Sequence, residues 1–118
     1  MTTLTRGMVL DVNLDPTLGS ENGKIRPCII VTNDVYNQRV PVIQVVPVTA
    51  WSAKKAKIAT NVEIDPIKGN GLSKKSVADC LQTRPIDHRL RLVRICGKLT
   101  YSQMNAIGQA LKIVFELA

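Results

Sequence analysis

The sequence predicts a mainly β domain with some helix (α+β), a small β-barrel or strongly curved sheet that ends in one helix. Three observations support this prediction. Short apolar runs rich in β-branched residues recur along the chain, turn residues separate them, and one amphipathic stripe stands at the end. A parallel α/β fold would need helices between its strands, and the sequence does not supply them. The chain fits a single domain, residues 1–118.

Residues 8–14 alternate apolar and polar side chains, which predicts a first strand with one face on the core. Turn residues follow, and the loop 15–24 is long. The runs 25–31 and 42–48 are unbroken and β-branched, which is typical of strands covered on both faces. Residues 32–34 begin a short turn or helical connection between these two strands.

The second half of the chain predicts shorter strands. Residues 51–60 are polar and basic, so we expect an exposed loop there. A short strand is expected at 62–64, and two further strands at 76–82 and 90–96. Residues 84–87 are expected to separate the last two strands.

The chain closes with an amphipathic helix. Thr100 and Gln103 have the spacing of a capping box, in which each side chain satisfies a backbone N–H of the other. The apolar residues that follow share one helical stripe: Met104, Ile107, Leu111, Val114 and Phe115.

The charge favours an anionic partner. Sixteen Lys and Arg stand against nine Asp and Glu, which gives a formal net charge of +7 and a pI near 9.7. A net charge of about 2 to 8 is also ordinary for a soluble small domain, so charge alone does not decide. The cations gather in the segments 54–57, 74–75 and 84–94, and this clustering favours nucleic acid modestly.

The cysteines and the N-terminus indicate a cytoplasmic protein. Cys28, Cys80 and Cys96 lie far apart in mainly apolar segments without a CxxC pair, so we expect reduced thiols in the core. The N-terminus lacks an apolar signal segment, and no run approaches the roughly 18 apolar residues of a membrane span. No membrane partner is expected.

One arginine and one threonine are candidates for an anion site. A polar, glycine-rich loop delivers Arg26 to the start of an apolar run. Pro27 fixes its own φ and pushes Arg26 into extended backbone, so the guanidinium starts from a stiff base. Thr49 places a hydroxyl directly after the run 42–48. If the two strands are neighbours, Arg26 and Thr49 face one phosphate together.

Other catalytic devices find little support in the sequence. His88 is the only histidine, and the cysteines do not have the spacing of metal ligands. Gly69-Asn70-Gly71 is too short for a phosphate-binding loop and predicts a turn. Chemistry at a phosphate must then rely on Arg, Thr, Ser, Gln or Lys, or the protein only binds. We expect neither a metal nor another cofactor.

Six short motifs occur in order over nearly the whole chain: Arg6-Gly7; Asp15-Pro16-Thr17 with Gly19-Ser20-Glu21; Arg26-Pro27; Pro47-Val48-Thr49; Ser76-Val77; and Gln82-Thr83-Arg84 with Ile86-Asp87. Each motif is weak alone, but the series at matching intervals resembles the MazF/PemK family of toxin endoribonucleases. The resemblance implies a homodimer with an SH3-like, CcdB/PemK-type small β-barrel and a C-terminal helix in each subunit.

The resemblance also implies metal-independent cleavage of single-stranded RNA at short sequence motifs. The 2′-OH of the RNA is then the nucleophile, and the products are a cyclic phosphate and a 5′-OH. Carried onto this chain, Arg26 would move protons or neutralise the phosphorane, and Thr49 would hydrogen-bond a non-bridging oxygen. The electrostatic role is the stronger one for Arg26, because the pKa of a guanidinium exceeds 12.

Six further residues are candidates for RNA binding: Ser20, Glu21, Gln82, Arg84, Trp51 and Lys54. Glu21 can equally pair with Arg26. Trp51 can stack on a base, at about 1 to 3 kcal/mol per base, or it can anchor its loop or contact a partner. Lys54 would steer the phosphates. The chain has only four aromatic residues, and Pro85 stands where many relatives can donate a backbone N–H, so the RNA sequence that is read stays open.

The implied partners are single-stranded RNA, a small acidic MazE-like antitoxin, a second copy of the chain, and operator DNA through the antitoxin. Two other functions stay open at this point. One is a CcdB-like gyrase poison, against which Arg26 and Thr49 argue. The other is a family member that only binds RNA or co-represses its own promoter.

Overall fold

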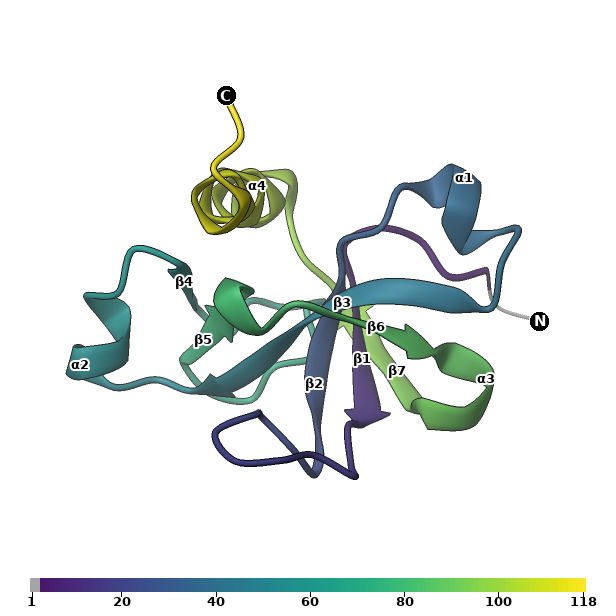
Figure 1. Ribbon diagram of the computed structural model, residues 1–118. Helices are drawn as coiled ribbons and strands as arrows, with labels where there is room; N and C mark the ends of the chain where they lie inside the picture. Colours follow the sequence, from purple (N-terminus) through teal and green to yellow (C-terminus); the bar gives the residue numbers. More distant parts are fainter. Residues whose placement is uncertain (1–2) are drawn as a thin grey trace.

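The computed structural model describes residues 3–118 (Figure 1). The strands are β1 (Met8–Asn13), β2 (Ile25–Ile30), β3 (Val42–Ala50), β4 (Asn61–Ile64), β5 (Ser76–Asp79), β6 (Arg84–Asp87) and β7 (Leu92–Lys98). The helices are α1 (Asp34–Asn37), α2 (Ala53–Ala56), the 3-10 turn η1 (Cys80–Gln82), α3 (His88–Arg91) and α4 (Tyr101–Phe115).

All strand pairs are antiparallel, in the order β4-β5-β3-β2-β1-β7, with β6 also on β3. The long strand β3 organises the sheet because it changes partners along its length. Its first residues pair with β6, its middle with β2 and its last residues with β5. The sheet is therefore strongly curved, and among the described residues its path stays open between β4 and β7. The predicted small curved sheet with a C-terminal helix is confirmed.

The central strands bury side chains on both faces. Val9 and Ile29 pack into a cluster beneath α4, which lies over one face of the sheet (Figure 1). Their neighbours Leu10 and Ile30 belong to a second cluster on the opposite face. This confirms the two-sided burial predicted from the unbroken runs for all but their first residues, Ile25 and Val42, which are 57% and 46% exposed. It also extends that burial to β1, for which alternation predicted one buried face, because Val9 lies under α4 and is fully buried.

Four segments differ from the sequence-based expectation. Residues 84–87 form strand β6 and do not merely separate two strands. Pro85 is tolerated there because β6 pairs with β3 alone, which leaves one edge without ladder bonds. The expected strand 76–82 ends at Asp79, and the expected strand 90–96 begins only at Leu92. In the expected loop 51–60, residues Ala53–Ala56 form α2.

The terminal helix is confirmed together with its cap. Thr100 Oγ1 accepts from Gln103 N at 3.2 Å, and Gln103 Oε1 accepts from Thr100 N at 3.0 Å. The predicted stripe buries Met104 and Ile107 and partly covers Leu111 and Val114. Phe115, which was assigned to the same stripe, is 56% exposed at the last position of the helix.

Candidate active site

The pairing of β2 with β3 brings Arg26 and Thr49 together. Cys28 is paired with Pro47, and the same antiparallel register extended by two residues sets Arg26 opposite Thr49. Both residues line one cavity of about 330 Å³. The remaining lining comes from Asp11, Pro27, Val48, Ala50, Gly71, Leu72, Ser73, Lys74, Ser76 and Arg94. The two residues that the sequence places on separate strands thus share one hollow.

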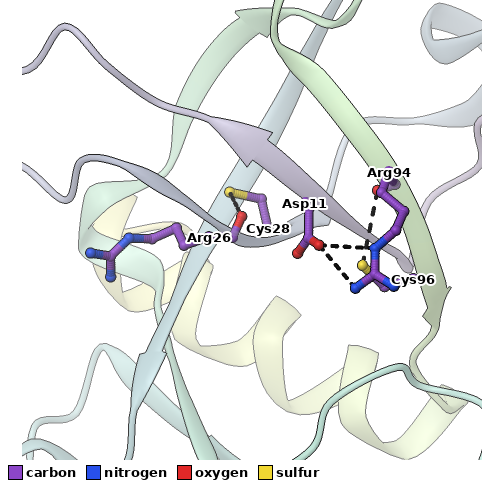
Figure 2. A network of polar contacts seen from close by, with 5 residues as sticks. All are labelled: Asp11, Arg26, Cys28, Arg94 and Cys96. Carbon is purple, nitrogen blue, oxygen red and sulfur yellow. Dashed lines mark hydrogen bonds and ion pairs between the residues drawn. The ribbon is translucent and has the colours of Figure 1, made fainter.

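Arg26 is half-buried and anchored through one nitrogen only. Its Nε donates to the carbonyl oxygen of Gly23 at 2.8 Å, which ties the guanidinium to the end of the 15–24 loop. Within residues 3–118 the two terminal nitrogens have no protein acceptor, so they keep their donors for a ligand. Figure 2 shows the Arg26 side chain directed away from the Asp11–Arg94 pair.

A second arginine lies at another part of the cavity wall. Arg94 donates through Nε and a terminal nitrogen to Asp11 Oδ2, at 3.1 and 3.0 Å (Figure 2). Lys74 lines the same cavity. Three cationic side chains therefore surround the space against one carboxylate, and the excess of positive charge suits a phosphate.

Four of the predicted RNA-binding residues meet in a second cavity, of about 640 Å³. Ser20, Glu21, Gln82 and Arg84 line it, together with Pro16, Asn22, Thr83 and Pro85. Gln82 holds the loop over this cavity, because its amide accepts from Asn22 N and donates to the Ser20 carbonyl at 3.0 Å.

Arg84 binds the residue just before the 15–24 loop, and Glu21 binds the loop itself. Arg84 donates to the Leu14 carbonyl at 3.0 Å, and Glu21 accepts from Leu18 N at 2.7 Å. The Glu21 carboxylate is therefore engaged by its own loop in this structure, and no ion pair joins it to Arg26 among the described residues.

Trp51 and Lys54 line neither cavity. The indole N–H of Trp51 donates to Glu63, and the Lys75 ammonium lies 4.6 Å from the ring centroid. In this structure Glu63 and Lys75 hold the Trp51 side chain. Lys54 is exposed, whereas its neighbour Lys55 reaches Thr49.

Sequence reasoning did not select Asp11, Arg94, Lys74 or Lys55 as site residues. A signal existed for the three cations, since they lie in the basic segments that favour a polyanion. Strand register and the cap of α2 decide which member of each basic segment reaches the cavity or Thr49, and composition reveals neither of them. Among residues 3–118 no three His, Cys, Asp or Glu side chains gather as ligands for a metal ion.

The buried thiols are not nucleophiles. Burial raises the pKa of Cys28 to about 12, although the charges of Arg26 and Arg84 act in the opposite direction. Burial likewise raises the pKa of Cys80 to about 12. All three cysteines are free, as expected, but Cys96 is only partly buried. Burial therefore leaves these two thiols with little of the thiolate form, which is the form that acts as a nucleophile.

These thiols predict a loss of stability at alkaline pH. The folded chain keeps protons on Cys28 and Cys80 that the unfolded chain releases above about pH 9, so the free energy of unfolding falls between pH 9 and 12. At pH 10 we expect about 1 kcal/mol from Cys28 alone. Urea unfolding at pH 8 and pH 10 measures the loss. The Cys28→Ala/Cys80→Ala variant should lose less, and an equal loss would assign the effect to other groups.

The family whose sequences match this chain is described as "PemK-like, MazF-like toxin of type II toxin-antitoxin system", and the match covers residues 5–115. Among curated proteins, the chain is 36% identical over 115 residues to "Endoribonuclease EndoA" of Bacillus subtilis (strain 168), covering 95% of this chain and 94% of that protein. Both matches span the two cavities.

Solved structures of MazF toxins have the same fold. The "Mycobacterium tuberculosis toxin MazF-mt6" superposes with a TM-score of 0.75 at 29% identity, over 94% of this chain and 98% of that one. MazF of Deinococcus radiodurans reaches 0.80 at 20% identity, over 98% and 99%, which supports the fold alone. From the family match and the shared sequence, the chain belongs to the PemK-like, MazF-like toxins of type II toxin-antitoxin systems.

Proposed function

We propose that this toxin is a metal-independent endoribonuclease that cuts single-stranded RNA at the cavity shared by Arg26 and Thr49. The observation that carries the proposal is this shared cavity, whose wall combines Arg26 and the Thr49 hydroxyl with Lys74 and Arg94. The similarity to the endoribonuclease of Bacillus subtilis supports the same reaction. The chain is then an enzyme, and its substrate is messenger RNA.

The reaction needs no nucleophile from the protein. The 2′-oxygen of the RNA loses its proton and bonds to the adjacent phosphorus, the bond from phosphorus to the 5′-oxygen breaks, and the 5′-oxygen takes up a proton. A 2′,3′-cyclic phosphate and a 5′-hydroxyl result, and DNA is not cut because it lacks the 2′-OH. Negative charge grows on the non-bridging oxygens as the phosphorane forms. Donors already in place at those oxygens lower the barrier.

Arg26 and Thr49 would supply these donors. The terminal nitrogens of Arg26 lack protein acceptors among the described residues, and a guanidinium suits two oxygens of one phosphate. Arg26 stabilises charge in this proposal, because a guanidinium stays charged in proteins and is a poor carrier of protons. Thr49 donates its hydroxyl to a non-bridging oxygen.

We propose that the second cavity binds bases of the RNA next to the cut. It presents amide, hydroxyl and guanidinium groups from Ser20, Gln82, Thr83 and Arg84, which match the edges of unpaired bases. The 15–24 loop lines this cavity and also binds Arg26 through Gly23. Base recognition and the position of the catalytic guanidinium are thereby linked by one loop.

The proposed partners are a small acidic antitoxin, a second copy of the chain and, through the antitoxin, operator DNA. Solved complexes of MazE with MazF from Deinococcus radiodurans, at 19% identity to this chain, support the antitoxin. The net charge of +7 suits an acidic peptide, and exposed Leu90, Val93 and Ile95 suit a subunit contact.

None of the helices in residues 3–118 has the length and apolar character of a membrane span. We propose a cytoplasmic location.

Incubating purified protein with a long single-stranded RNA in EDTA tests the function. We expect cuts at discrete sites, with a cyclic phosphate on one product and a 5′-OH on the other, and no cut in a matched DNA. Intact RNA with inhibited gyrase would instead indicate a gyrase poison. Intact RNA with a shifted band in a gel would indicate a member that only binds. Either result would overturn the nuclease proposal.

A further inference from the structure

The ammonium group of Lys55 lies next to the Thr49 hydroxyl. Lys55 Nζ is 3.4 Å from Thr49 Oγ1 and 3.2 Å from the carbonyl oxygen of Ala50. Lys55 is half-buried and does not line the cavity, whereas Thr49 does. The lysine therefore reaches the site through the threonine.

The backbone of Lys55 is fixed from two sides. Ser52 is the N-cap of α2, and its hydroxyl oxygen accepts from Lys55 N at 3.1 Å. Asn61 Nδ2 donates to the carbonyl oxygen of Lys55, also at 3.1 Å. The flexible lysine side chain thus begins from a defined position, which lowers the entropy cost of holding its ammonium at Thr49.

The chemistry of an ammonium sets the direction of the Thr49 hydroxyl. A lysine ammonium has three donors and no acceptor, so Thr49 Oγ1 must accept from Lys55 and cannot donate to it. In the part of the chain that the structure describes, Lys55 is the only side chain hydrogen-bonded to Thr49 Oγ1. The hydroxyl proton consequently has no protein acceptor there and is left for a ligand in the cavity.

We propose that Lys55 is a positioning residue for phosphodiester cleavage, which occupies a lone pair of Thr49 Oγ1 and aims the hydroxyl proton at the scissile phosphate. This inference rests on the proposed function. The positive charge of Lys55 also polarises the Thr49 hydroxyl, and it strengthens the hydrogen bond that this hydroxyl donates as negative charge grows on the phosphate oxygens. Because that charge peaks in the transition state, Lys55 acts on kcat more than on RNA affinity.

Lys57 provides a matched control. It is the C-cap residue of the same short helix and carries the same charge, but it is exposed and contacts neither Thr49 nor the cavity. We expect Lys55→Met to lower kcat about tenfold, the loss of one charge-assisted hydrogen bond, and Lys57→Met to leave kcat within twofold. Affinity for an RNA with a 2′-deoxy residue at the cut site should change little in either variant. Thermal melting checks that both variants are folded.

Combining substitutions separates positioning from direct contact. In the Thr49→Ala background, Lys55→Met should lower kcat no further, because the group through which it acts is already gone. If Lys55→Met costs the same factor with and without Thr49, the ammonium touches RNA itself and the proposal is overturned. Full kcat in Lys55→Met together with a large loss in Thr49→Ala would refute the inference alone and leave the proposed function intact.

A measurement without RNA keeps the inference testable if the wild type cuts nothing. The ammonium resonance of Lys55 in an ¹⁵N-edited NMR spectrum should move on Thr49→Val, whereas that of Lys54 should not. An unmoved Lys55 resonance would show that the contact is absent in solution.

Discussion

We expect Arg26→Ala to lower the rate of RNA cleavage a hundredfold or more without unfolding the protein. A positioned donor at developing negative charge contributes on the order of 3 kcal/mol to transition-state stabilisation. Arg26 is half-buried and holds the protein through a single bond to Gly23, so the cost in stability should be small. Single-turnover cleavage of a good RNA substrate measures the effect. Thr49→Ala should give a loss of similar size, and Thr49→Ser should recover part of it.

Arg39→Ala is the control for charge. Arg39 is an exposed arginine just after α1, and it lies away from both cavities of the site. Removing it lowers the net charge by the same one unit, so a purely electrostatic effect of net charge would appear in both variants. Near-normal cleavage by folded Arg26→Ala would refute the assignment of the active site.

The second large effect is expected at Gly97, where we predict that Gly97→Ala destabilises the fold by about 3 kcal/mol. A Cβ at this position would lie 2.3 Å from the Gly69 carbonyl oxygen and 2.6 Å from the Asn70 carbonyl carbon. Both are backbone atoms and cannot rotate away. The turn 69–71 therefore must move off β7. Because Gly71 lines the cavity that we propose as the active site, cleavage should fall as well.

Thermal melting of Gly97→Ala should show a drop in Tm of roughly 10 °C or more. Gly108→Ala is the matched control, because a Cβ on Gly108 meets nothing within 4 Å and the residue lies inside α4. There the same substitution should stabilise by up to about 1 kcal/mol through helix propensity. Equal melting temperatures for the two variants would contradict the packing argument.

Local patterns were sufficient where a segment's structure depends on its own residues. The capping box of Thr100 and Gln103 and the stripe behind it identified α4, because helix caps and helical periodicity are properties of one segment. The unbroken runs identified β2 and β3 as strands buried on both faces, since only such strands need no polar face. Arg26 and Thr49 were selected from their places beside these runs.

Local patterns failed where a residue outside the segment decides its structure. Residues 84–87 contain a proline and read as a connection, but β3 offers them an edge at which a missing N–H costs nothing. Leu90 suggested an early strand start, yet the Asp87 side chain accepts from Arg89 N at 3.0 Å and caps the short helix α3 instead. In both cases the deciding contact lies outside the pattern that was read.

Composition, periodicity and turn chemistry depend on a few neighbouring residues, so they were sufficient to predict the fold class, the basic character, the terminal helix and the candidate pair Arg26 and Thr49. The charged groups around that pair could not be predicted in this way, because they come together only in the folded chain. Arg94 and Asp11 meet across β1 and β7, 83 residues apart in sequence, and Lys55 rather than Lys54 reaches Thr49. Register accounts for the difference, since a shift by one residue along a strand or a short helix turns a side chain from the site to solvent.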